Sequence, residues 1–246
     1  MKLSQVILNV RRPQGIAQFY HHYLGMHMTR GDGYWLVGYG GSGAQIELRT
    51  STSDHTYEHH DTDLYWKVGI TLPDVDVAYA QLRDAGVAVT EPSQFRDIGY
   101  MCHLTDPEGF QIELLQHTFQ GVRSTIGVDA NLPLGGSAQL GQITLRVSNI
   151  NKALEKYRDD LGMRLLSIQK VPDLGFTLYF LAFTDETPPV ANLEAVANRE
   201  WLWQRPYTTL ELQHVHNKVI VDKACHHDLG FHGLSIESAT GTRTIL

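Results

Sequence analysis

The sequence predicts an α+β fold in which a small βαβββ unit is repeated. The units are expected to form open, half-barrel mixed sheets with helices on their outer faces. Two observations predict this fold. First, short segments with apolar residues at every second position enclose a segment with apolar residues at helical spacing. Second, the pattern that begins at Gln5 recurs 137 residues later at Gln142, and such self-similarity indicates a duplicated structural unit.

The composition is that of a folded chain. Its 246 residues are 42% hydrophobic and 19% charged, which suits two domains with cores of their own and argues against disorder. A formal net charge of -7, without runs of Lys or Arg, argues against a nucleic-acid partner. We expect a cytoplasmic protein without a membrane partner, because there is neither a signal-peptide stretch nor a long apolar run. Cys102 and Cys225 are too few for a disulfide framework, and we expect neither to carry function.

The first unit opens with a strand over residues 5–10, whose β-branched and alternating apolar content is typical of strands. A helix should follow, and it should end at the Leu-Gly-Met of residues 24–26, where glycine can adopt the left-handed conformation. The apolar positions at helical spacing are Ile16, Phe19, Tyr20 and Tyr23. The unit closes with a strand that contains Glu47.

The second unit begins with a strand over residues 67–72 and continues through a helix that turns at Gly86. The apolar positions of this helix are Val75, Ala78, Leu82 and Ala85. The Asp-Pro-Glu-Gly of residues 106–109 predicts a turn, and the strand after it runs over residues 110–115. We assign residues 1–118 to an N-terminal domain of two units and the Gly-, Ser- and Thr-rich residues 119–140 to a linker.

The C-terminal domain, residues 141–246, should hold one complete unit and part of another. Its strand over residues 142–147 precedes a helix with apolar positions at Ile150, Leu154, Tyr157 and Leu161. An irregular stretch, residues 185–205, contains tryptophans that we expect to pack against the domain. A fourth unit starts at residues 231–236 and is cut short. Because open sheet edges need cover, the truncation favours a homodimer.

Each complete unit places a glutamate in its last strand: Glu47, Glu113 and Glu211. Each of the three lies between apolar neighbours that should pack on the helix, so alternation turns the carboxylates to the opposite face. A sheet with one face in water would show the same alternation. The equivalent first-strand positions of Gln5 and Gln142 favour a functional site instead.

The repeated Gln-x-x-Leu-x-Val strand, the helix that ends in Leu-Gly-Met, the Leu-Glu-Leu strand and the Asp-Pro-x-Gly-x-x-Ile-Glu motif resemble the vicinal oxygen chelate superfamily. This superfamily includes glyoxalase I, extradiol dioxygenases and bleomycin-resistance-like, metal-free binding proteins. The C-terminal half is most similar to glyoxalase I. The resemblance implies paired units, each of which supplies one ligand from its first strand and one from its last strand to a divalent metal.

Carried over by position, the resemblance implies metal ligands at Gln5, Glu47, Glu113, Gln142, Glu211 and His232. Carboxylate, amide and imidazole groups suit Zn, Ni, Mn or Fe(II). Lys67 departs from the pattern, because it stands where the family has histidine and a protonated lysine has no lone pair for a metal. We expect Lys67 to lie between Glu47 and Glu113, where an internal salt bridge would replace the cation.

Three further residues complete the predicted site. Asn9 and Arg146 stand where the family holds its substrate, and Lys67 is the third substrate-binding candidate. His103, with Glu113 and Glu211, is a candidate catalytic group, because imidazole titrates near neutral pH. A hydrogen-bonded strand histidine is the alternative for His103.

Three functions remain open. The first is a glyoxalase I-like, metal-dependent lyase or isomerase that acts on a small oxygen-chelating substrate, in which Glu113 or Glu211 moves a proton. The second is an Fe(II)-dependent ring-cleaving dioxygenase, although residues 92–101 lack the histidine that it requires. The third is a metal-free protein that binds a hydrophobic or aromatic small molecule, which Lys67 favours.

Overall fold

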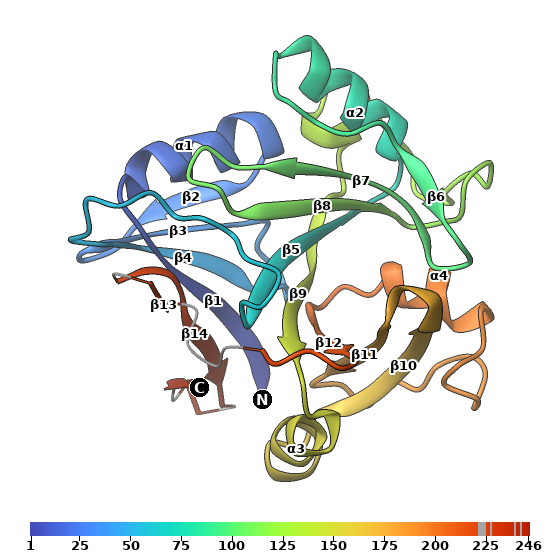
Figure 1. The fold of residues 1–246 in the computed structure, drawn as a ribbon. Helices are drawn as coiled ribbons and strands as arrows, with labels where there is room; N and C mark the ends of the chain where they lie inside the picture. The colour runs from blue at the N-terminus through green and yellow to red at the C-terminus, as the bar shows by residue number, and fades with distance from the viewer. Residues whose placement is uncertain (221–224, 227, 239, 242) are drawn as a thin grey trace.

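The computed structural model describes residues 1–246 apart from 221–224, 227, 239 and 242. Among the described residues, the strands form two mixed sheets that lie side by side, with helices on their outer faces (Figure 1). The predicted α+β fold of repeated units with half-barrel sheets is confirmed. No helix in the described part of the chain is long and apolar enough to cross a membrane.

The first sheet is built from the first unit and the beginning of the fourth. In spatial order, its strands are β13 (Cys225–His226), β14 (Leu229–Glu237), β1 (Lys2–Val10), β4 (Gln45–Thr50), β3 (Tyr34–Gly38) and β2 (His27–Arg30). A short strand, β15 (Arg243–Ile245), pairs with β14. Because β14 runs antiparallel to β1, the predicted fourth unit extends the sheet of the first unit within the same chain.

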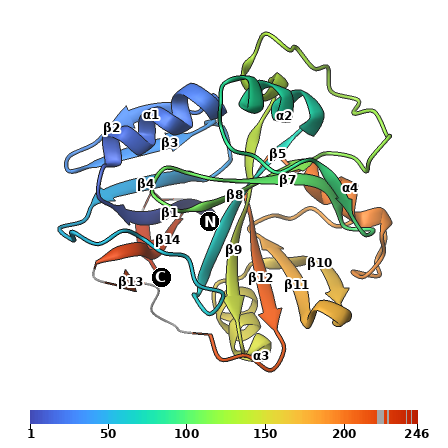
Figure 2. The same ribbon diagram turned by 45° about the horizontal axis from the view of Figure 1, so that its top comes forward.

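The second sheet is built from the second and third units. In spatial order, its strands are β10 (Arg164–Val171), β11 (Phe176–Ala182), β12 (Thr209–Val215), β9 (Gln139–Val147), β5 (Tyr65–Leu72), β8 (Gln111–Gln116), β7 (Gly99–Thr105) and β6 (Ser93–Phe95). The opening strands of the two units, β5 and β9, pair antiparallel at the centre. Figure 2 shows them side by side in the middle of the molecule.

This pairing corrects one expectation. We expected the first and second units to pair with each other in one domain, and the structure pairs the second with the third and the first with the fourth. The units are similar in sequence, so the opening strand of each unit could pair with the opening strand of any other unit. The choice between them depends on long-range packing that no local motif encodes. The predicted boundaries near residues 118 and 140 stay a prediction.

The helices begin and end close to where the sequence predicts them. These predicted helices are α1 (Pro13–Leu24), α2 (Val75–Asp84) and α3 (Ile150–Leu154), which has a π-helical continuation over Glu155–Asp160. A fourth helix, α4 (Ala197–Trp203), was not predicted. Gly25 and Gly162 have φ values of 69° and 75°, which confirms the left-handed ends predicted for the two Leu-Gly-Met segments. The inner residues of α1 are fully buried against Val6, Leu8 and Val10 of β1.

Helix α4 lies in the segment predicted to be irregular. The indole ring of Trp203 packs edge-on against Phe180 with ring centroids 5.2 Å apart, and its Nε1 donates to the carbonyl of Ile98 at 3.0 Å. These contacts confirm that a tryptophan of this stretch packs against the sheet. They also bring α4 to the side of the second sheet that carries the candidate site.

The segment predicted to be a linker is packed against the helices of the N-terminal half. The side chain of Gln81 on α2 donates to the carbonyls of Ala130 and Leu132 and accepts from the backbone N–H of Leu134. Leu134 is fully buried. This stretch therefore packs on α2 as part of the folded structure.

The predicted turn over residues 106–109 connects β7 to β8 and contacts the start of α1, the helix that packs on the first sheet. Asp106 accepts from the backbone N–H groups of Glu108 and Phe110. The buried carboxylate of Glu108 in turn accepts from the backbone N–H groups of Arg11 and Arg12 at 3.0 and 3.1 Å. Because these N–H groups lie at the start of α1, the contact stabilises the positive end of that helix.

Candidate functional site

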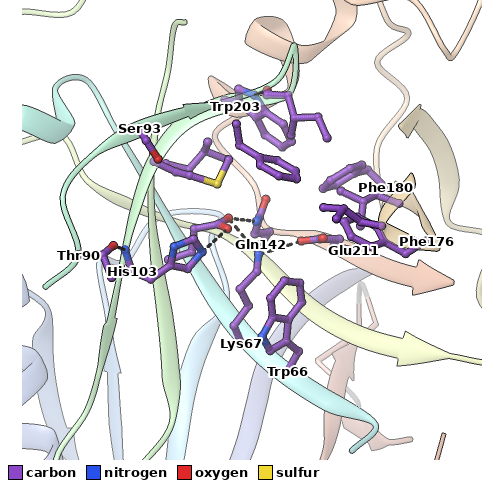
Figure 3. Close-up of a pocket in the computed structure, with 17 residues that line it drawn as sticks. Trp66, Lys67, Thr90, Ser93, His103, Gln142, Phe176, Phe180, Trp203 and Glu211 are labelled. Carbon is purple, nitrogen blue, oxygen red and sulfur yellow. Dashed lines mark hydrogen bonds and ion pairs between the residues drawn. The ribbon is translucent and has the colours of Figure 1, made fainter. Parts of the chain in front are cut away.

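A cavity of about 300 Å³ lies on the concave side of the second sheet. Its polar end is formed by β5, β8, β9 and β12 at the centre of the sheet (Figure 3). Its walls come from β6, β7, β11, α4 and the turn after β10. The residues that line it are Trp66, Lys67, Thr90, Ser93, Phe95, Ile98, Met101, His103, Glu113, Leu115, Gln142, Leu174, Phe176, Leu178, Phe180, Trp203 and Glu211.

A buried ion triad stands at the polar end. The Nζ of Lys67 lies 2.9 Å from Glu113 Oε1 and 3.3 Å from Glu211 Oε2. The side chains of the three residues are exposed by 2%, 6% and 2%, respectively. At this burial, the ammonium and the carboxylates interact in a low-dielectric environment, and each depends on the others for its charge.

Strand register explains why these residues meet. Glu113 pairs with Gly69 across the parallel β5 and β8, and Glu211 pairs with Thr144 across the parallel β9 and β12. The antiparallel pairing of β5 with β9 then sets Lys67 opposite Thr144. Side chains at paired positions project from the same face of a sheet, so the two glutamates approach the lysine from opposite sides.

Glu113 accepts from three donors. Its Oε1 accepts from Lys67 and, at 2.7 Å, from Gln142 Nε2, while its Oε2 lies 3.0 Å from His103 Nε2. Burial alone would raise the pKa of Glu113. The charge of Lys67 and the hydrogen bond from His103 outweigh burial, so this pKa lies below its ordinary value. Since Glu113 is therefore an anion, the proton of the contact with His103 resides on Nε2.

Glu211 has fewer donors. Its Oε2 accepts from Thr144 Oγ1 at 2.7 Å and from Lys67. Burial raises the pKa of Glu211, and the charge of Lys67 offsets this only in part because Glu113 raises it further. For Lys67, burial would lower the pKa, but the two carboxylates raise it and keep the amine protonated. The site thus holds one firmly ionised carboxylate and one that takes up a proton more readily.

Gly69 leaves the space that Gln142 needs. A Cβ atom at this position would lie 2.3 Å from Gln142 Cγ and 2.7 Å from its Cδ, far inside contact distance. The amide of Gln142 can therefore lie across β5 and reach Glu113. Its orientation is fixed because the reverse amide orientation would place an oxygen against an anionic carboxylate.

Aromatic and aliphatic side chains cover the rest of the cavity. Figure 3 shows Trp66 beside Lys67, with Phe176, Phe180 and Trp203 around the opposite side. The ring of Trp66 lies 4.8 Å from Lys67 Nζ and 4.7 Å from the guanidinium carbon of Arg146. A polar end inside an otherwise apolar cavity is the usual form of a small-molecule site.

Lys67 has only one of the two partners expected for it, Glu113. Glu47 lies in β4 of the first sheet and binds Arg49 at 2.6 Å, so it takes no part in the triad. Glu211 stands in its place, because the second unit pairs with the third. The internal salt bridge predicted for Lys67 is present with Glu113 as one partner and Glu211 as the other.

The other predicted residues fall outside the cavity. Gln5 is buried in β1, and His232 in β14 is exposed; both belong to the first sheet, so the six predicted metal ligands do not converge. Asn9, also in β1, donates to Asp228. Arg146 stacks on Trp66 and donates to Gln213 at 3.1 Å. Their metal-binding or substrate-binding roles stay predictions.

The residues of the triad do not fit a divalent metal. The ammonium of Lys67 stands between the two carboxylates that a metal would need, and it repels a second cation. Within the described residues, no group of three or more His, Cys, Asp and Glu side chains is arranged to hold a metal ion. A divalent ion could enter this donor set only after Lys67 lost its proton or moved away.

Several residues of the site were missed by the sequence analysis. Thr144 lies on the predicted inward face with Gln142, and this alternation could have identified it. Trp66 could not be found this way, because the register of β5 shifts between Tyr65 and Lys67 and alternation fails there. Phe180 and Trp203 come from segments whose place over the sheet depends on tertiary packing.

Comparisons with known proteins agree with this fold. Residues 2–114 match the sequence model of the Glyoxalase/Bleomycin resistance protein/Dioxygenase superfamily, which confirms the predicted resemblance for this part of the chain. The chain is 30% identical over 98 residues to Glyoxalase I of Saccharomyces cerevisiae, a match that covers 39% of this chain and 28% of that protein. It is 46% identical over 43 residues to a lactoylglutathione lyase of Neisseria meningitidis, covering 18% of this chain and 31% of that one.

Among solved structures, glyoxalase I from Zea mays is similar with a TM-score of 0.67 and 20% sequence identity, over 95% of this chain and 73% of that chain. A putative dioxygenase from Bacillus subtilis gives a TM-score of 0.54 at 13% identity, over 88% of this chain and 65% of that one. These likenesses extend the shared fold over both sheets. The matches to the curated relatives span less than a third of the length of those proteins.

Proposed function

We propose that the cavity of the second sheet binds a small, largely apolar molecule without a divalent metal, and that the ammonium of Lys67 is the resident cation of the site. One observation carries the proposal: Lys67 Nζ lies 2.9 and 3.3 Å from the two glutamates that the family resemblance assigns to a metal. An ammonium that is held between two carboxyl groups supplies the positive charge that a metal ion would otherwise bring to this buried place.

The size and lining of the cavity support a molecule of one or two rings. About 300 Å³ lies at the small end of ligand pockets. The apolar side chains would bury most of such a ligand, while Lys67, Gln142 and Glu211 would contact its polar group. Thr90 and Ser93 lie near the exposed end of β6 and β7, where the ligand would enter.

The test is a binding titration with and without metal. Protein purified without chelators is analysed for bound metals and titrated with 1-naphthalenemethanol, with quenching of Trp66 and Trp203 as the signal. We expect saturable binding that is unchanged by EDTA and by added Zn²⁺. Binding that appears only after a divalent metal is added, or that EDTA abolishes, would overturn the proposal.

A matched pair of variants locates the binding. Ser93→Phe places a ring at the mouth of the cavity, and Ser42→Phe makes the same change in an exposed turn of the first sheet. Ser93→Phe should weaken binding by about tenfold or more, since a ligand must displace the ring, and Ser42→Phe should leave it unchanged. Equal effects of the two variants would place the ligand elsewhere.

A second function, a lyase or isomerase reaction, is favoured by the opposite pKa shifts of the two glutamates. Two carboxyl groups whose surroundings separate their pKa values suit one fixed anion and one group that transfers protons. Here Glu113 is the fixed anion and Glu211 the proton carrier. In the forward step, a proton would leave a carbon next to a carbonyl for Glu211, and the electron pair would move onto the carbonyl oxygen. Lys67 would stabilise that oxygen until the proton returned.

Proton exchange tests this second function. Hydroxyacetone incubated with the protein in D₂O would lose the NMR signal of its carbon-bound protons faster than in buffer, and Glu211→Gln should abolish the acceleration. Glu194→Gln, a change at an exposed ion pair with Lys170, should leave it intact. Should the wild-type protein exchange no faster than buffer, the pocket is a binding site without this chemistry for hydroxyacetone.

A further inference from the structure

We infer that the ligand of this cavity carries a hydrogen-bond donor at its polar end and that an organic ammonium on an aromatic or hydrophobic body is the class that fits best. The inference rests on the proposed function, because it names the ligand of the same site. Three features of the polar end support it: unoccupied acceptors, two carboxyl groups that share one ammonium, and rings that face a cation.

The first feature is the carbonyl oxygen of Gln142. This side chain is only 2% exposed, and its Oε1 has no hydrogen-bond partner among the described residues. The hydrogen bond from its Nε2 to Glu113 fixes the amide, so the oxygen cannot exchange places with the nitrogen. A buried acceptor without a partner is destabilising, and a donor on the ligand would remove that penalty.

Glu211 offers a second acceptor. Its Oε2 receives both Thr144 and Lys67, whereas no residue of the described chain donates to its Oε1. Gln142 and Glu211 both line the same end of the cavity, as Figure 3 shows. Two acceptors at one end favour a group with several N–H or O–H bonds.

The charge of the polar end points to a cation. Two carboxyl groups, those of Glu113 and Glu211, face the single ammonium of Lys67 at this end of the cavity, and a cation that binds beside Glu211 favours the ionised form of that carboxyl group. Among the described lining residues, Lys67 is the sole Lys or Arg, and Arg146 stacks on Trp66 without lining the cavity. Two carboxyl groups beside one ammonium attract a cationic ligand and disfavour a carboxylate.

The aromatic walls add to this preference. Trp66 already contacts the ammonium of Lys67 with its ring face, and Phe176, Phe180 and Trp203 lie across the cavity. Aromatic faces attract ammonium groups, and more strongly where water is excluded. The same rings would bury the apolar body of the ligand.

The test compares three probes that share one ring system. These are 1-naphthylmethylamine, which is a cation at pH 7, 1-naphthalenemethanol, which is neutral, and 1-naphthoate, which is an anion. We expect the amine to bind about tenfold more tightly than the alcohol and the anion to bind most weakly. An amine that binds no more tightly than the alcohol, or an anion that binds as tightly as the amine, would overturn the inference.

A variant pair shows which charge produces the preference. Glu211→Gln keeps the shape of the side chain and removes the second carboxyl group, so the amine should lose about tenfold in affinity while the alcohol changes little. Glu194→Gln should preserve the ratio between the probes. If Glu211→Gln fails to fold by circular dichroism, the ratio of probe affinities in the wild-type protein still decides the question.

The two proposals fail in different ways. Absence of saturable binding for all three probes would contradict the proposed function itself. Metal-independent binding of the alcohol together with no preference for the amine would contradict the ammonium inference alone.

Discussion

Replacement of Lys67 by methionine tests the ion triad directly. Methionine has nearly the same length, so the change leaves Glu113 and Glu211 side by side in a buried place without their cation. One of the carboxyl groups must then take up a proton on folding. From an ordinary glutamate pKa near 4.3, this uptake costs about 4 kcal/mol at pH 7, close to the 3–5 kcal/mol typical of breaking a buried ion pair.

This origin of the cost predicts its pH dependence. The folded variant binds one proton more than the unfolded chain, so the loss of stability should shrink by about 1.4 kcal/mol for each unit below pH 7. Near pH 5 it should be about 1 kcal/mol. Urea unfolding followed by circular dichroism at pH 5, 6 and 7 measures the difference from the wild-type protein at each pH.

Two further variants complete the design. Lys67→Met combined with Glu211→Gln should recover at least half of the lost stability, because the remaining Glu113 keeps its donors from Gln142 and His103. Lys170→Met removes an exposed partner of Glu194, in an ion pair of 2.6 Å, and should cost less than about 1 kcal/mol. The reasoning is refuted if Lys67→Met costs under about 1 kcal/mol at pH 7 or if its cost does not fall on acidification.

Three other changes probe the site and its surroundings. Lys67→His replaces the ammonium with an imidazole, which can bind a metal beside the two carboxylates. This variant should bind about one Zn²⁺ per chain, measured by elemental analysis. Zinc uptake no greater than in the wild-type protein would count against the position assigned to Lys67. Burial lowers the pKa of His117 to about 4. Between pH 6.5 and 4 the unfolded chain therefore binds one proton more than the folded chain. The free energy of unfolding should fall as the pH drops through this range, by up to about 3 kcal/mol. His117→Leu should remove that slope in urea unfolding, and an unchanged slope would rule out this origin. Gly69→Ala should displace Gln142, whose Cγ lies 2.3 Å from the added Cβ, and weaken probe binding, while Gly15→Ala, where the nearest atom is 3.9 Å away, should not.

The fold was largely predictable because its signals are local. The helix ends at Gly25 and Gly162 need a left-handed conformation that glycine adopts without strain. The turn after Asp106 needs an Asx residue, a proline and a glycine in sequence. Strand alternation turned Glu113 and Glu211 to the same kind of face. None of these inferences depends on which unit lies next to which.

The partners within the site were not predictable from these signals. Lys67 was expected beside Glu47 because the two belong to consecutive units, and the chain instead pairs β5 with β9. The sequences of the units are too alike for alternation to distinguish the two pairings. Trp66 was missed for a different reason, since a register shift next to Lys67 breaks the alternation from which an inward residue is inferred.

The charge of the resident cation connects the two proposals. A divalent ion bound to the two glutamates would give a polar end with no net charge and with open coordination positions for ligand oxygens. The ammonium of Lys67 contributes half that charge and has no coordination positions, so a second carboxyl group and the free acceptor atoms of Gln142 and Glu211 remain for the ligand. A protein with this triad is therefore expected to select a ligand by the donors that it brings, where a metal-containing relative would select it by its oxygen atoms. Because the lysine is part of the chain, this preference should not vary with the supply of metal.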